Sequence, residues 1–338
     1  MVFKMASMAT IITAVAAFVI TAIAGVILIP ILRKLKFGQT ILEDGPKWHK
    51  NKQGTPTMGG FMFIIGSIFA VIIGLSMAYA FDKTSLGTSK EIMRLLAGIV
   101  MALGFGAIGY LDDYEKVIKK QNLGLTAKQK LLLQVLVAVC YLLILYMFGD
   151  RSTIVNIPFL GQWDMGVLYY PFMGILIIGI VNSANLTDGI DGLLGSVTFV
   201  IAIFFMIATT TLRLIGMNIL ATALAASCLG FLIFNVHPAK VFMGDTGSLF
   251  LGGVVVALAF GIDMPILLFF VGLIYCIESL SVIMQVISFK TTGKRIFRMS
   301  PIHHHFEMGG MSENKIVAMF CFITAIMCAL AYWAVTRI

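Results

Sequence analysis

The stretch Gly174–Phe205, GILIIGIVNSANLTDGIDGLLGSVTFVIAIFF, holds two apolar runs with a short polar interval between them. Each run belongs to a segment long enough to cross a bilayer as an α-helix, which takes about 20 apolar residues. Similar runs recur along the 338-residue chain. The stretch therefore predicts a helical membrane protein whose polar residues gather where the spans reach the membrane surface.

The composition supports this class of protein. Hydrophobic residues make up 59% of the chain and charged residues only 12%, whereas a soluble domain carries about a quarter charged residues. A membrane β-barrel would show short segments of alternating polarity, and the sequence has none. The five cysteines lie inside apolar runs without a CxxC pair, which indicates neither a disulfide framework nor a zinc site.

The apolar runs predict an all-α fold with ten transmembrane helices in a single domain over residues 1–338. No internal repeat and no linker divides the chain. The predicted spans are residues 8–32, 58–80, 92–111, 131–149, 166–184, 193–212, 215–234, 247–262, 265–288 and 315–336.

The distribution of Lys and Arg predicts the orientation. Sixteen of the 24 lie on the side reached after the first span, and seven lie on the opposite side. Because positively charged loops stay in the cytoplasm, we expect both termini to be extracytoplasmic. The net charge of +8 is then explained by the membrane surface and anionic reactants, and we expect no nucleic acid partner.

Five polar motifs fall on this same cytoplasmic side. Charge close to hydrocarbon is costly unless function requires it, so their convergence predicts an active-site cleft at the cytoplasmic face. The motifs are GTPTMGG (Gly54–Gly60), LDDYEK (Leu111–Lys116), VNSANLTDGIDGLLG (Val181–Gly195), NVHPAKVFMGDTGS (Asn235–Ser248) and SPIHHHFE (Ser300–Glu307).

The polar interval of the opening stretch holds Asn182, Asn185, Asp188 and Asp191 at a spacing of three. Three residues turn an α-helix by 300°, so the four cannot share one narrow face. The glycine that follows each of the two Asp weakens a helix there. We expect the two Asn in the last turns of the fifth span and the two Asp in a loop facing the cleft. Capping of the sixth span is the alternative for Asp191.

Three further carboxylates indicate a metal site. Asp112 and Asp113 lie at the end of the third span, where the helix macrodipole disfavours negative charge, so they require a cation such as Lys116 or a metal ion. Asp245 precedes the eighth span, where it could instead cap the helix. Magnesium prefers oxygen ligands, and these three side chains fit it better than zinc.

Three other features of the sequence bear on the site. His303, His304 and His305 are consecutive, so they cannot all bind one ion without distortion, and they are typical of phosphate contacts or proton transfer. Residues 104–109 match GxGxxG but lie inside the third span with no preceding strand, which favours close helix packing over dinucleotide binding. Glu278 lies deep in the ninth span and could pair within the bundle or line the cleft.

Magnesium-type carboxylates beside a basic membrane surface imply phosphate substrates, one of them a lipid phosphate. Phosphoryl transfer needs mainly positioning and charge neutralisation, which such a site supplies. An ion-coupled transporter is the rival interpretation, because transporters also break helices at polar residues. It would place these residues near the bilayer midplane and often shows inverted repeats, neither of which the sequence indicates.

Four of these motifs, from LDDYEK to SPIHHHFE, resemble in sequence and order the polyprenyl-phosphate N-acetylhexosamine-1-phosphate transferases. GTPTMGG and PIHHHFE resemble one branch, the phospho-N-acetylmuramoyl-pentapeptide transferases. The resemblance covers essentially the whole chain. It implies transfer from UDP-N-acetylmuramoyl-pentapeptide to undecaprenyl phosphate, giving lipid I and UMP for peptidoglycan synthesis. It further implies Mg²⁺ as cofactor, a homodimer in the bacterial plasma membrane and a bent ninth span. A sister enzyme using UDP-N-acetylglucosamine is the alternative within the family.

The resemblance also implies residue roles. Asp112 matches the carboxylate that deprotonates the lipid phosphate, Asp113 its essential neighbour, Asp245 the magnesium ligand, His304 the central histidine and Phe242 the ring that stacks on uracil. The sequence leaves open which Asp binds the metal, whether the lipid phosphate attacks directly or through an aspartyl intermediate, and whether Lys50 replaces Lys52. The other matching substrate positions are Lys52, Thr57, Lys130, Asn182, Asn185, Asp188, Asp191, Asn235, Gln285, His303 and His305.

Overall fold

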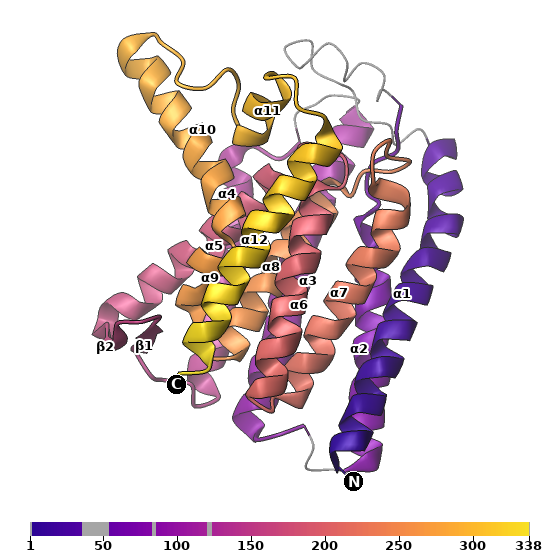
Figure 1. The fold of residues 1–338 in the computed structure, drawn as a ribbon, viewed down its shortest axis with the longest axis vertical. Helices are drawn as coiled ribbons and strands as arrows, with labels where there is room; N and C mark the ends of the chain where they lie inside the picture. The colour runs from indigo at the N-terminus through magenta and orange to yellow at the C-terminus, as the bar shows by residue number, and fades with distance from the viewer. Residues whose placement is uncertain (1, 36–53, 83–85, 120–123, 338) are drawn as a thin grey trace.

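A computed structural model describes residues 2–35, 54–82, 86–119 and 124–337. Within these ranges, ten helices are long and apolar enough to cross a membrane, which confirms the predicted all-α polytopic fold. They form one bundle, and both termini lie at the end of it opposite the short helix α11 (Figure 1).

The elements follow one another as α1 (Val2–Lys34), α2 (Gly60–Phe81), α3 (Ser89–Lys119), α4 (Ala127–Met147), β1 (Ile154–Ile157), β2 (Gly161–Asp164), η2 (Gly166–Leu168), α5 (Tyr169–Thr187), α6 (Leu193–Thr211), α7 (Ile215–Asn235), α8 (Gly244–Gly261), η3 (Pro265–Leu267), α9 (Leu268–Val271), α10 (Leu273–Thr292), α11 (Ile302–Glu307) and α12 (Glu313–Val335). The two η elements are short 3₁₀-helices.

Helix α8 is the centre of the bundle. Its side chains are nearly all buried, and it packs most extensively against α3, with α5 and α2 also in contact. Lipid tails are as apolar as the helices, so close van der Waals packing rather than hydrophobic burial holds such helices together. Helix α8 is therefore a rigid support for Asp245, which lies near its N-terminal end.

Glycines bring α3 and α8 together. A Cβ on Gly109 would lie 2.1 Å from the backbone oxygen of Asp245, and a Cβ on Gly98 would lie 2.7 Å from the Cβ of Ala257. On the partner helix, a Cβ on Gly253 would meet Ala102 at 2.8 Å. Gly109 is the last residue of the GxGxxG pattern, so the predicted role in helix packing is confirmed.

Gly109→Ala is expected to lower the free energy of unfolding by about 2 kcal/mol or more, because backbone atoms of α8 must move to admit the methyl group. Thermal unfolding of the detergent-solubilised protein would measure it. Gly104→Ala is the matched control, since its Cβ would meet only the side chain of Val137, at 3.2 Å. Equal midpoints for the two variants would contradict the close approach at Gly109.

Several helices extend beyond the predicted spans. Helix α3 continues to Lys119, so LDDYEK lies inside the helix rather than at its end. Helix α8 begins at Gly244, which places Asp245 in its first turn. In both places charged residues end the apolar run, but the backbone hydrogen bonds continue because these residues tolerate helical structure.

The predicted ninth span is broken. Residues 265–288 form η3, α9 and most of α10, with a break at Gly272. A Cβ on Gly272 would lie 2.7 Å from the backbone oxygen of Leu268, and Pro265 begins η3. Helix α10 leans away from the other helices at the α11 end of the bundle (Figure 1). This geometry agrees with the expected bend of the ninth span.

One element was not predicted. Strands β1 and β2 form an antiparallel hairpin, with Ile154 opposite Asp164 and Ile157 opposite Gly161. The predicted spans leave residues 150–165 as a connection without assigned structure. The turn is closed by Gly161 at φ +94°, a conformation that glycine adopts without strain. Strands of four residues are too short to produce a clear alternation of polarity.

Candidate functional site

The start of α8 is held by Asp113 of α3. The backbone N–H groups of Asp245 and Thr246 donate to the Asp113 carboxylate at 3.1 and 2.9 Å, and the Thr246 hydroxyl donates to it at 2.7 Å. A carboxylate at a helix N-terminus satisfies otherwise unpaired N–H groups and complements the helix dipole. Gly244 makes the preceding turn at φ +71°. Asp113 therefore fixes the position of Asp245.

The structure brings the three predicted carboxylates together. Oxygen atoms of Asp112, Asp113 and Asp245 lie within 4.8 Å of one another, although Asp245 is more than 130 residues away in sequence. Asp112 and Asp113 are both buried. Asp112 also accepts a hydrogen bond of 2.9 Å from the backbone N–H of Leu125. Three negative charges so close together need nearby cations.

Two lysines supply those cations. Lys116 Nζ lies 2.6 Å from Asp112 Oδ2 and 3.2 Å from Asp245 Oδ2. Lys130 Nζ, from α4, lies 2.6 Å from the same Asp245 oxygen. Asp112 thus pairs with Lys116, one of the two cations that the sequence left open. Lys130, expected to bind substrate, pairs here with Asp245. The arrangement is a compact group of five charges that could exchange internal ion pairs for contacts with phosphate.

The donor set also fits a magnesium ion. All three acidic side chains offer carboxylate oxygens, the hard ligands that magnesium prefers. Both oxygens of Asp113 are held by backbone N–H groups at the start of α8. Asp112 and Asp245 each pair instead with lysine ammonium groups that an ion could displace, so these two are the better placed ligands. A bound ion would take over the neutralising role of Lys116 at these two side chains.

The four polar residues of the opening stretch go to three different places. As expected, Asn182 and Asn185 lie in the last turns of α5, and Asp188 and Asp191 lie in the loop before α6. Asn185 joins the carboxylate site, since its Nδ2 donates to Asp245 at 3.0 Å. Asn182 instead exchanges two hydrogen bonds with Gln134 of α4, and among the described residues it has none with the carboxylates.

The pKa of Asp188 is shifted by its burial and by neighbouring carboxylates. Burial raises the pKa of its carboxyl to about 8, and the negative charges of Asp245, Asp113 and Asp191 act in the same direction. The folded protein therefore binds a proton here more tightly than the unfolded chain. The stability contributed by this proton is fully present below about pH 4, the usual range of a free carboxyl, and is lost as the pH rises through about 8.

Asp188→Asn is accordingly expected to raise the thermal unfolding midpoint of magnesium-free protein by a few degrees at pH 9, and by less at pH 6. The amide removes the group that must ionise in a buried acidic environment. Unfolding followed from pH 5 to pH 9 would show a shallower decline for the variant than for the wild type. Parallel pH curves would contradict the raised pKa.

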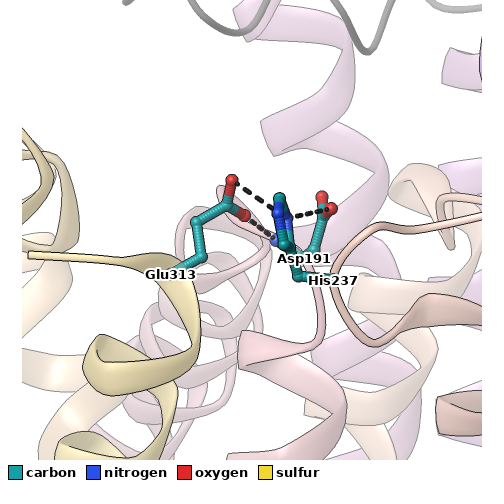
Figure 2. A group of neighbouring side chains, drawn as sticks. All are labelled: Asp191, His237 and Glu313. Carbon is teal, nitrogen blue, oxygen red and sulfur yellow. Dashed lines mark hydrogen bonds and ion pairs between the residues drawn. The ribbon is translucent and has the colours of Figure 1, made fainter.

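Asp191 belongs to a second group with His237 and Glu313 (Figure 2). His237 Nδ1 lies 3.0 Å from Asp191 Oδ2 and 3.4 Å from Glu313 Oε1. The backbone N–H of Asp191 donates to Glu313 Oε2 at 2.9 Å, and Ala239 donates its N–H to Asp191 Oδ2 at 2.9 Å. These contacts tie the α5–α6 loop, the α7–α8 loop and the start of α12 together.

A cavity of about 680 Å³ opens beside this group, and Asp191, His237 and Glu313 are among its lining residues. His237 and Glu313 are not among the residues predicted from the sequence. His237 stands inside the NVHPAKVF motif, which was the available signal. Glu313 stands in the first turn of the last span, with no sequence neighbour that points to the site.

Two further predicted residues bind backbone groups through their side-chain amides. Asn235 is buried, accepts the Gly192 N–H and donates to the Val241 carbonyl, so it fastens two loops. Gln285 binds the backbone of Ile296 and Phe297 through its amide. Both amides thus hold backbone segments in place.

Phe242 and Thr57 lie on neighbouring segments. Phe242 is half-buried, and its backbone N–H donates to the Pro56 carbonyl at 2.8 Å. A Cβ on Gly244 would lie 2.9 Å from the Thr57 hydroxyl, which places Thr57 beside the start of α8. Lys52 and its alternative Lys50 fall outside the described residues.

The three histidines have separate partners, so their side chains do not converge on one point. His303 is fully buried with its Nδ1 3.0 Å from Glu278 Oε1. His304 Nδ1 lies 2.9 Å from Glu307 Oε2. His305 Nδ1 accepts a hydrogen bond of 3.1 Å from the backbone N–H of Arg298.

Comparisons with known proteins agree with the resemblance seen in the motifs. Residues 95–263 match the model of glycosyl transferase family 4. The chain is 48% identical over 319 residues to a phospho-N-acetylmuramoyl-pentapeptide-transferase of Clostridium perfringens, covering 94% of this chain and 96% of that protein. It is 44% identical to the enzyme of that name from Acetivibrio thermocellus, covering 94% and 92%, and 47% identical to that of Heliobacterium modesticaldum, covering 90% and 92%. Such identity over nearly the whole length shows that the chain belongs to the phospho-N-acetylmuramoyl-pentapeptide-transferase family.

Proposed function

We propose that this protein transfers phospho-N-acetylmuramoyl-pentapeptide from its UDP-linked donor to undecaprenyl phosphate, forming lipid I and UMP for peptidoglycan synthesis. The observation that carries the proposal is the group of three carboxylates and two lysines at one end of a membrane-spanning bundle. Such a site offers cations to two anionic reactants and stands where a lipid phosphate and a water-soluble donor can meet. Membership of the family supports the identity of the two substrates.

The lysines carry most of the binding in this proposal. Without substrate, Lys116 and Lys130 neutralise Asp112 and Asp245. Phosphate oxygens can replace these carboxylates as partners of the ammonium groups, so that the two reacting phosphates approach without strong repulsion. Asp112 would accept the proton of the lipid phosphate. An oxygen of that phosphate then bonds to the sugar-linked phosphorus, and the pyrophosphate bond to UMP breaks.

Magnesium completes the site in this proposal. Asp245 would hold the ion, with Asp112 beside it as the proton acceptor, while Asp113 keeps Asp245 in place through the α8 N-terminus. When bound, the ion would neutralise negative charge on the donor pyrophosphate. Asn185 would orient the second oxygen of Asp245, to which it donates at 3.0 Å.

The proposed location in the cell rests on the charge distribution of the sequence. The excess of Lys and Arg in the loops after odd-numbered spans supports a plasma-membrane protein with this site facing the cytoplasm. The cavity beside Asp191 and His237 has room for part of the nucleotide donor, in line with the substrate role predicted for Asp191. We also propose a homodimer, as the resemblance implies, which light scattering in detergent would test.

UMP release tests the function. Purified protein in detergent would be given undecaprenyl phosphate and UDP-N-acetylmuramoyl-pentapeptide, with magnesium or with a chelator. We expect magnesium-dependent release with this donor and none with UDP-N-acetylglucosamine. Release with the glucosamine donor alone would support the sister enzyme. Failure of folded protein with both donors would contradict a transferase and favour the transporter interpretation.

A further inference from the structure

Glu278 is a buried carboxylate that the proposed chemistry does not use. It lies in α10, a predicted membrane span, and is fully buried. A charge in such a place is costly unless a partner compensates it, and it commonly marks a functional position. Its partner is His303 of α11, which is also fully buried. The Glu278 carboxylate lies against both the ring and the backbone of His303. Its Oε1 is 3.0 Å from the ring Nδ1, and its Oε2 is 3.5 Å from the backbone nitrogen.

The other side of the His303 ring rests on the α5–α6 loop. A Cβ on Gly189 would lie 2.1 Å from His303 Nε2 and 2.4 Å from its Cε1, so the ring touches the backbone where only glycine leaves room. Neither ring nitrogen has a hydrogen bond of good geometry among the described residues. The contact between Glu278 and His303 is therefore close in distance without the alignment of a hydrogen bond. His303 is clamped between α10 and the loop that carries Asp188.

Helix α11 needs tertiary contacts to fix its position. It has only six residues, Ile302–Glu307, and begins after Pro301 without a side-chain cap. Helices this short are not stable by themselves, so tertiary contacts must decide where the helix lies. The rings of His303 and His304 are 4.1 Å apart, so a shift of one moves the other. Unlike His303, His304 and His305 keep some exposure to solvent.

We infer that Glu278 is a positioning residue for the transfer reaction, acting through His303 to hold α11 and thereby His304 and His305 in place. This inference rests on the proposed function, because it assumes that these histidines serve the transfer. Glu278 itself does not touch substrate. The same position of α11 is set from the opposite side by Gly189, so two residues on different elements control one histidine.

Two variants test the inference from these two sides. Glu278→Gln keeps the size of the side chain and removes its charge, whereas Gly189→Ala removes nothing and pushes on the His303 ring. The matched controls are Glu91→Gln, a carboxylate at the opposite end of α3 from the site, and Gly179→Ala, whose Cβ would meet no atom within 4 Å. Each protein is assayed for kcat and KM in UMP release and for its thermal unfolding midpoint.

We expect kcat to fall by about ten- to a hundredfold in both variants, with a smaller rise in KM for the donor, because misplaced groups weaken mainly the transition state. The controls should match wild type. In a His303→Asn background, Glu278→Gln and Gly189→Ala should cause almost no further loss, as expected for residues that act through one group. Full activity in both variants, or losses that simply add in that background, would overturn the inference.

A readout without substrate separates this inference from the proposed function. Diethyl pyrocarbonate modifies accessible histidines, and mass spectrometry locates the modified residue. We expect His303 to be protected in wild type and in both controls, and to react in Glu278→Gln and Gly189→Ala. An inactive wild type with this labelling pattern would reject the function but keep the clamp. Protection of His303 in both variants, or labelling explained by a matching drop in the unfolding midpoint, would reject the clamp.

Discussion

Asp245→Asn is expected to lower the rate of UMP release by about a thousandfold, the size of effect seen when one key electrostatic group is removed from an active site. Asp245 Oδ2 is shared by Lys130 at 2.6 Å and Lys116 at 3.2 Å, so this side chain holds both cations. A neutral amide cannot balance them, and it is a poor ligand for magnesium beside Asp112. The rate should be measured with saturating donor and lipid phosphate.

Asp164→Asn is the control for this substitution. Asp164 ends the hairpin at the opposite end of the bundle, so its loss should leave UMP release unchanged. The unfolding midpoint of Asp245→Asn should stay close to that of wild type, because Asp112 still pairs with Lys116. A folded Asp245→Asn protein with substantial activity would refute the role proposed for this carboxylate.

Asp113→Asn is expected to reduce UMP release by about a hundredfold and the free energy of unfolding by about 2 kcal/mol. Asp113 accepts three hydrogen bonds from the start of α8. Asparagine offers one oxygen and presents an NH₂ group to N–H donors, so at least one buried N–H loses its partner. The start of α8 then shifts and carries Asp245 away from the lysines, and small displacements of such a group are costly.

Thr246→Val provides the graded comparison for Asp113. It removes only the hydroxyl donor of the three hydrogen bonds and keeps the shape of the side chain. We expect a smaller loss of both activity and stability than in Asp113→Asn. An inactive Asp113→Asn protein with a wild-type unfolding midpoint would contradict the capping role, and would favour direct contact of Asp113 with substrate or metal.

The candidate site was predictable where a motif carried its own chemistry. The carboxylates of LDDYEK and MGDTGS could be grouped because both follow the ends of spans on the same side of the membrane. The partners within the site were less predictable. Asn182 and Asn185 look alike in sequence, yet Asn185 binds Asp245 and Asn182 binds Gln134, because one turn of helix directs them toward different neighbours.

Asp191 shows the same limit more strongly. Its spacing with Asp188 suggested one shared cleft, but its carboxylate lies with His237 and its backbone N–H binds Glu313. Glu313 is separated from it by more than 120 residues. Local spacing reports the direction of a side chain relative to its own helix, and it contains no information on which distant loop arrives opposite.

The sequence by itself determined the ten spans, the side on which the polar motifs gather and the packing role of the glycines in α3, because each depends on hydropathy, charge or residue size over a short window. Only the tertiary structure decided that Asp113 caps α8, that Lys116 and Lys130 share Asp245, and that Glu278 clamps His303. The physical reason is that these ion pairs and hydrogen bonds join separate helices, and their geometry is set by how closely small residues such as Gly109 and Gly189 let those elements approach.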